Sequence, residues 1–251
     1  MKSEWNKLDN AAKIFPAAQS KKDTQVFRFS CELYKTVNKD LLQKATEDTL
    51  EEFDIFKSIL RRGLFWYYLE ESDIKPIVRE EYKIPCSLIY QRNNHKLLFE
   101  VTYYRNRINL EVFHVLTDGT GAMNFLKTLV SNYLTLAENV EDSGVDYDAS
   151  STQKSDDSFS KYYSGKISSK QENNPVAYKI VGRKYPDDKL KVINGMVYVK
   201  KVLEESHKYN ATLTAFLSAV LVKSIIDEMP VRSKGKKPIT ILIPVNLRNF
   251  F

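Results

Sequence analysis

One histidine and the residues around it say more about the fold and chemistry of this chain than any other feature of the sequence. His114 is followed four residues later by Asp118 and then directly by Gly119. The preceding residues 107–113 alternate apolar and polar side chains, which is typical of a β-strand. Apolar residues then recur at helical spacing as far as residue 134. We therefore expect His114 at a strand-to-helix junction, where a side chain is held rigidly and still reaches a cleft.

The chemistry of imidazole suits that position. A neutral histidine is the usual general base near pH 7, and the chain has only three, His95, His114 and His207. A base there can take a proton from a hydroxyl or amine as that group attacks a thioester. The alternative is an ordinary core or surface histidine followed by Asp-Gly, which is a common turn dipeptide.

The flanking segments predict a mixed α+β fold. Strand-like runs cover residues 26–34, 64–69, 86–90 and 96–104, and helical spacing covers 37–53. Residues 104–107 are typical of a hairpin turn, and Thr120 is a candidate cap for the helix after the histidine. This order favours an α+β (mixed α/β) sandwich with a sheet backed by helices.

The C-terminal part predicts a separate region behind a linker. Residues 138–158 carry seven acidic side chains against one lysine, which indicates a solvated connection. The predicted organisation is therefore a domain at 1–138, a linker at 139–173 and a further region at 174–251. In that last region we expect strands at 191–199 and 239–245 and a short helix at 202–209. Thr212 or Thr214 is expected to open a long helix that is largely buried and ends at Pro230.

Composition excludes several classes of protein. The net charge of +6 is scattered, with no basic run interleaved with aromatics, so no nucleic-acid partner is expected. Cys31 and Cys86 are too few for a disulfide framework or zinc site, and both are expected to be buried; no metal is predicted. No apolar run follows Met1, and residues 213–222 fall short of the about 20 residues that span a bilayer. A cytoplasmic location without a membrane span is the default expectation.

The histidine motif resembles the active-site motif of the chloramphenicol acetyltransferase-like superfamily. That superfamily includes condensation domains of peptide synthetases and alcohol O-acetyltransferases. Residues 5–16, 63–70 and 243–251 sharpen the resemblance toward a bacterial alcohol acetyltransferase-like group. The resemblance implies a chloramphenicol acetyltransferase-like sheet backed by helices, of which this chain is the N-terminal half and the start of the second.

The resemblance also implies a reaction and roles for site residues. His114 would be the catalytic base, while Asp118, Gly119 and Arg248 would support the site, with Asp118 paired to Arg248. The donor would be acetyl-CoA or another acyl-CoA and the acceptor a small alcohol or amine, with no permanently bound cofactor. Alternatives are condensation of carrier-bound substrates and a non-catalytic interaction module. Phe113 stands where condensation domains usually carry a first histidine, which disfavours the condensation reading.

The resemblance covers only part of such a protein. The second-half motif of the family, an Asp-Phe-Gly-Trp-Gly-like run, does not occur in this chain. Because the family builds its tunnel from two halves, we expect these 251 residues alone to be a poor catalyst. We also expect an exposed apolar edge at 239–245 to permit self-association.

Overall fold

The computed structural model describes residues 5–8, 12–64, 66–91, 95–138, 175–183, 185–186 and 190–243. The chain divides into two compact units, Met1–Ser164 and Gly165–Phe251. The predicted linker at 139–173 lies outside the described residues.

The first unit is built on a four-stranded sheet in the order β2-β7-β6-β5. The strands are β2 (Val26–Glu32), β7 (Arg107–Phe113), β6 (Phe99–Tyr104) and β5 (Arg79–Glu80). β7 pairs antiparallel with both β2 and β6, whereas β5 runs parallel to β6. Arg105 adopts a left-handed conformation (φ 54°) in the tight β6–β7 hairpin, where the sequence predicted a turn.

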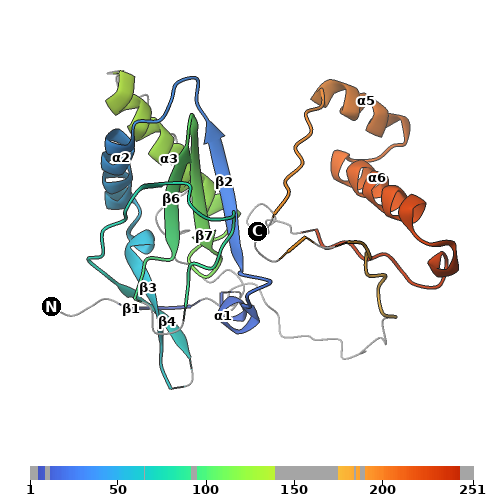
Figure 1. Ribbon diagram of the computed structural model, residues 1–251, viewed down its shortest axis with the longest axis horizontal. Helices are drawn as coiled ribbons and strands as arrows, with labels where there is room; N and C mark the ends of the chain where they lie inside the picture. The colour runs from blue at the N-terminus through green and yellow to red at the C-terminus, as the bar shows by residue number, and fades with distance from the viewer. Residues whose placement is uncertain are drawn as a thin grey trace. The chain divides into compact units, whose positions relative to one another are not determined.

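Two helices cover one face of this sheet, α2 (Lys39–Glu52) and α3 (Gly119–Glu138) (Figure 1). Successive side chains of a strand point to opposite faces, and Ile108, Leu110 and Val112 of β7 are all completely buried in the core on the helix side. The predicted α+β fold with a sheet backed by helices is confirmed.

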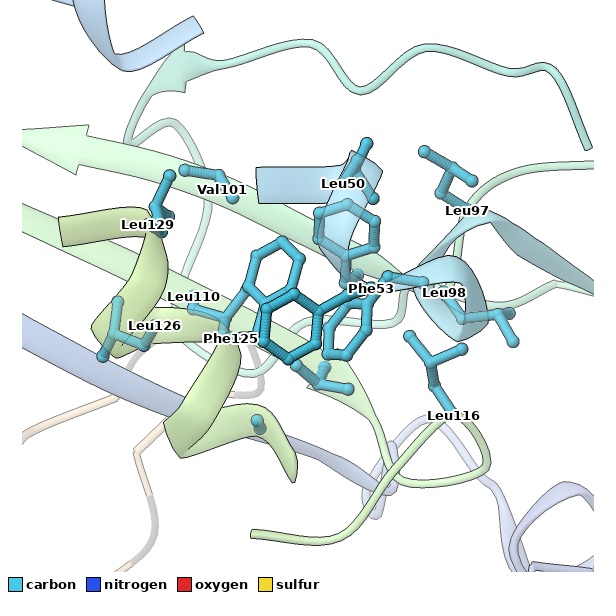
Figure 2. Packing of buried hydrophobic residues seen from close by; sticks show 14 of the residues in the cluster. Leu50, Phe53, Leu97, Leu98, Val101, Leu110, Leu116, Phe125, Leu126 and Leu129 are labelled. Carbon is cyan, nitrogen blue, oxygen red and sulfur yellow. The ribbon is translucent and has the colours of Figure 1, made fainter. Parts of the chain in front are cut away.

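Aromatic rings fill the space between the helices and the sheet. Phe125 of α3 stacks on Phe56 at a centroid distance of 4.1 Å and meets Phe53 and Phe99 edge-on, each at 5.3 Å. Figure 2 shows Phe125 amid leucines, among them Leu110 of β7 and Leu50 of α2. Edge-on and stacked pairs of this kind add about 0.5–1.5 kcal/mol each beyond the area that they bury. This core fixes α3 against the sheet, and α3 begins where the histidine motif ends.

The opposite face of the sheet is polar but also covered. Glu111 of β7 is 1% exposed and lies 2.7 Å from Arg28 of β2, which also binds Glu81 at 2.5 Å. Glu81 in turn binds Arg107 at 2.9 Å, and the Cys86 backbone N–H donates to Glu111 at 2.6 Å. Residues 78–90, which lack regular structure apart from β5, thus form a polar cover that is held by buried charges.

A smaller sheet has the order β1-β4-β3, with β1 (Trp5–Lys7), β3 (Ser58–Arg62) and β4 (Tyr67–Glu71). A one-turn 3₁₀ helix, η1 (Asp54–Lys57), leads into β3, and the short helix α1 (Ile14–Ala18) precedes β2. The strand predicted at 64–69 begins later, at Tyr67, and pairs with β3, which the sequence did not predict. The strand predicted at 86–90 is wrong, because Cys86 has a left-handed backbone (φ 58°) that cannot continue a strand.

The second unit contains α5 (Val199–Lys208), α6 (Leu213–Glu228) and the 3₁₀ turn η3 (Val231–Ser233). Thr212 caps α6 by accepting a hydrogen bond from the Ala215 N–H at 3.2 Å. The sequence predicted Thr212 or Thr214 at the start of this helix, and the first of the two is confirmed. The predicted burial of this helix is wrong, since no residue of α6 is buried.

The two strands predicted in this unit are also wrong as far as they are described. Residues 191–198 and 239–243 have no strand structure, and Leu242 is 92% exposed. A strand requires a hydrogen-bonded neighbour, and the described residues offer none here. Residues 244–245 lie outside the described part of the chain.

Among the described residues no single helix is long and apolar enough to cross a membrane. α5 and α6 reach that length and composition only together, with a bend of 83° between them.

Candidate active site

His114 occupies the junction between β7 and α3. Its backbone N–H donates to the Gln25 carbonyl at 2.9 Å, one step beyond the last β2–β7 ladder pair, Val26 and Phe113. Gln25 is left-handed (φ 55°), a conformation that costs a non-glycine residue about 1 kcal/mol or more. The chain then turns through a 2.9 Å bond from the Leu116 N–H to the Phe113 carbonyl. The predicted strand-to-helix position of His114 is therefore present.

The His114 imidazole lies among aromatic rings. The Phe15 ring stacks on it at a centroid distance of 4.4 Å and an angle of 12°, and the Phe27 ring lies at 4.8 Å, tilted by 57°. The side chain as a whole is half-buried. Its Nδ1 atom is buried and has no hydrogen-bond partner among the described residues. If a substrate group meets this ring through a nitrogen, the buried Nδ1 leaves Nε2 for that contact.

Asp118 caps the helix that follows. Its Oδ1 accepts a hydrogen bond from the Gly121 N–H at 2.9 Å, and its carbonyl accepts from the Ala122 N–H at 3.1 Å. These are the bonds of an N-cap, so the cap predicted at Thr120 is wrong, and Asp118 takes that role. Arg248 lies outside the described residues, and its pairing with Asp118 stays a prediction.

Gly119 of the motif and Gly121, two residues later, have different surroundings. A Cβ atom built on Gly119 would lie 3.9 Å from Phe29, an ordinary contact. A Cβ atom on Gly121 would lie 2.0 Å from the Thr117 Oγ1 and 3.3 Å from the Thr117 Cβ. The close approach that demands glycine is therefore at Gly121, which the sequence analysis did not single out.

Phe113, directly before the histidine, points to the other face of β7. It is completely buried and stacks on Tyr90 at 5.6 Å with the rings 4° from parallel. This position is a packing position between the sheet and its polar cover. A second histidine here would replace an apolar ring in the core.

The remaining ionisable candidates do not form a metal site. Within the described ranges, no group of three or more His, Cys, Asp and Glu side chains is placed to hold a metal ion. Cys31 and Cys86 are half-buried rather than buried as predicted. Burial raises the pKa of both thiols, and the Glu111 charge raises that of Cys86 further.

Sequence reasoning missed the residues that surround the imidazole. Phe15, Gln25 and Phe27 all contact His114 from a segment about 90 positions away, which no local spacing reveals. Phe15 does belong to residues 5–16, one of the segments on which the family resemblance rested.

Among known proteins, this chain is similar to solved structures only. No protein-family model and no curated protein matches the chain. Similar solved structures include a mutant of the starter condensation domain of rhizomide synthetase, with a TM-score of 0.50 and 12% identity over 64% of this chain and 44% of that one. A mutant of the same domain in complex with C8-CoA has a TM-score of 0.49 and 12% identity, covering 60% and 40% of the two chains.

The first condensation domain of the calcium-dependent antibiotic synthetase, with a substrate analogue, has a TM-score of 0.46 and 13% identity, covering 58% and 41%. The chain thus spans less than half the length of these domains. The likeness to the rhizomide synthetase domain shows that this chain shares the condensation-domain fold over 64% of its length.

Proposed function

We propose that the full-length protein is an acyltransferase that moves an acyl group from a coenzyme A thioester to a small alcohol or amine. The observation that carries this proposal is the setting of His114. On a condensation-domain fold, it stands at a strand-to-helix junction, with Nδ1 buried and without a hydrogen-bond partner among the described residues.

His114 Nε2 would act as general base in a single transfer step. It takes the proton from the acceptor hydroxyl or amine as that oxygen or nitrogen attacks the thioester carbonyl carbon. The new C–O or C–N bond forms, the C–S bond breaks, and the imidazolium returns the proton to the departing thiolate of coenzyme A. No covalent acyl-enzyme is required, because the base activates the acceptor directly.

The surroundings of the motif support this role for His114 and a structural one for Asp118. The Asp118 Oδ1 accepts a hydrogen bond in the first turn of α3, which supports a structural role for this carboxylate. The Phe15 and Phe27 rings make an apolar wall beside the imidazole, which suits a site that excludes water from an acyl thioester.

Transfer to a free small molecule is favoured over condensation of carrier-bound substrates. The observation that favours it is Phe113, which fills the core at the position where condensation domains usually carry a first histidine.

A release assay in the full-length protein tests it. Free thiol is measured as an acyl-CoA series is offered with a panel of alcohols and amines. His114→Ala is expected to lower acceptor-dependent release by about 10²–10⁴-fold, the usual cost of losing a general base.

His207→Ala is the matched control, because His207 is an exposed histidine in the last turn of α5. That variant is expected to keep the wild-type rate. A His114→Ala protein that turns over acyl-CoA at the wild-type rate would refute the assignment. Activity only with substrates attached to a carrier protein would instead select the condensation reading.

A further inference from the structure

Among the described residues, no hydrogen bond to Nδ1 orients the His114 ring. The torsion that joins an imidazole to its Cβ has a broad, roughly two-fold preference, so an outside contact must fix the ring plane. In many catalytic and metal-binding histidines that contact is a hydrogen bond to the second ring nitrogen. His114 Nδ1 is buried and has no such partner among the described residues.

The Phe15 ring supplies the missing contact. It lies 4.4 Å from the imidazole centroid and only 12° from parallel, whereas Phe27 is tilted by 57°. A near-parallel ring at this distance blocks rotation of the imidazole out of its plane, because any large rotation drives ring atoms into the phenyl face.

The stacked ring is itself held in place. The Phe15 N–H donates to the Ala12 carbonyl at 3.3 Å, and its own carbonyl accepts from the Gln19 N–H at 3.0 Å. The Gln19 side chain reaches the carbonyls of Thr24 and Tyr90, both at 3.3 Å. α1 is thus tied to the start of β2 and to the polar cover, and it presents Phe15 to the imidazole from a fixed position.

We propose that Phe15 is a positioning residue for His114, whose flat ring replaces the orienting hydrogen bond. The inference rests on the proposed function, in which His114 Nε2 meets the acceptor. Phe15 touches neither substrate nor reacting atoms in this role. It acts by holding the imidazole plane so that Nε2 keeps one direction.

A simple space-filling role makes a different prediction. A filler tolerates a leucine of similar volume, while a positioning ring requires an aromatic face. Phe15→Leu and Phe15→Tyr therefore separate the two roles, and Ile14→Ala is the matched control because the neighbouring Ile14 of α1 is 64% exposed.

Nuclear magnetic resonance of the imidazole protons reads the stack directly. Only three histidines contribute such signals, and His114→Ala identifies the signals of His114. The phenyl face shields protons above it, so Phe15→Leu is expected to move the His114 signals downfield and leave those of His95 and His207 in place. Phe15→Tyr and Ile14→Ala are expected to retain the wild-type positions.

A kinetic readout tests whether the stacked ring positions Nε2 for the reaction. In the full-length protein, Phe15→Leu is expected to lower kcat and leave the KM for acyl-CoA unchanged, with recovery in Phe15→Tyr.

The outcomes separate this inference from the proposed function. If wild-type protein shows no nuclear Overhauser contact between the Phe15 and His114 rings, the inference fails whether or not any variant folds. It also fails if Phe15→Leu leaves the His114 signals unchanged. The proposed function is judged separately, by the loss of acyl transfer in His114→Ala. The expected result is a Phe15–His114 contact in wild type that Phe15→Leu removes and Phe15→Tyr restores.

Discussion

Asp118 is the residue whose role the structure and the family resemblance describe differently. The structure shows its carboxylate capping α3, and the resemblance predicts an ion pair with Arg248. Asparagine caps a helix about as well as aspartate but carries no charge. The substitution Asp118→Asn therefore tests the charge while keeping the cap.

If capping is the whole role, Asp118→Ala is expected to cost about 1 kcal/mol of unfolding free energy and Asp118→Asn very little. If the carboxylate also belongs to a buried ion pair, Asp118→Asn is expected to cost about 3–5 kcal/mol. Urea unfolding of the two variants beside wild type measures both costs. A stable Asp118→Asn protein would exclude the Arg248 pairing.

Gly121 is expected to tolerate alanine poorly, although it lies in the first turn of a helix. In a helix interior, glycine to alanine usually stabilises by about 0.5–1 kcal/mol. At Gly121 the new methyl would lie 2.0 Å from the Thr117 Oγ1, so Gly121→Ala is expected to lower the melting temperature instead. Gly119→Ala, with only a 3.9 Å contact to Phe29, is the matched control and is expected to be neutral or stabilising.

A second substitution shows whether Thr117 is the cause. Gly121→Ala combined with Thr117→Gly is expected to recover more stability than the two separate changes predict by addition. Strict additivity in that double-mutant cycle would mean that the clash with Thr117 is not what destabilises the helix.

At the scale of elements, the polar cover of residues 78–90 depends on buried charges. Burial opposes the charged form of Glu81, but hydrogen bonds and charges from Arg28 and Arg107 outweigh it and hold its pKa below the usual range. A carboxyl whose pKa is lowered by folding stabilises the folded state above its unfolded pKa. That contribution is lost as the pH falls through the folded pKa.

The folded chain is therefore expected to lose stability as the pH falls below about 4, the ordinary range of a glutamate. Glu81→Gln is expected to flatten this part of the pH profile and to lower stability at neutral pH, where Arg28 and Arg107 lose a partner. Urea midpoints measured from neutral to acidic pH test this, with exposed Glu80→Gln as control. Equal acid slopes for Glu81→Gln and wild type would contradict it.

The elements also show where sequence reasoning succeeds and fails. Alternation predicted β7 because Ile108, Leu110 and Val112 face the helices on one side. The same alternation did not predict that the other face of β7 is also covered, where Asn109 and Glu111 are buried by partners from distant segments. β5 is too short to have a pattern, and the left-handed Cys86 interrupts a run that is strand-like in composition.

The candidate site divides in the same way. The place of His114 followed from local periodicity, because a strand and a helix each leave a repeating pattern. Its contacts with Phe15 and Phe27 did not, since contacts between rings 99 and 87 positions apart in the sequence leave no periodic trace. The α6 prediction failed because an apolar sequence shows what a helix would bury, but not that a partner surface is present.

At the scale of the whole molecule, the two units differ in their cores. The hydrophobic cluster runs from Leu8 to Tyr133, all in the first unit. Among the described residues of the second unit, only Ser206 and Met229 are buried. Burial of apolar surface is the main force that offsets the loss of chain entropy, so the described residues of the second unit contribute little stability.

Amide hydrogen exchange on the whole chain is expected to reflect that difference. Amides of β7 and α3 are expected to exchange only on global unfolding, while those of α5 and α6 exchange through local opening. Equal protection in the two units would show that the helices of the second unit are stabilised by contacts outside the described residues.

Cys86 gives the molecule a built-in chemical reporter. Its thiol is half-buried with a raised pKa, next to Glu111 and within the cover that Glu81 and Arg28 hold in place. Alkylating reagents react with the thiolate, so labelling of the closed form is slow. Any event that lifts the cover brings this sulfur into water and away from the carboxylate. The rate of labelling at Cys86, compared with Cys31 on β2, therefore records how often the sheet is uncovered, without any substrate or engineered residue.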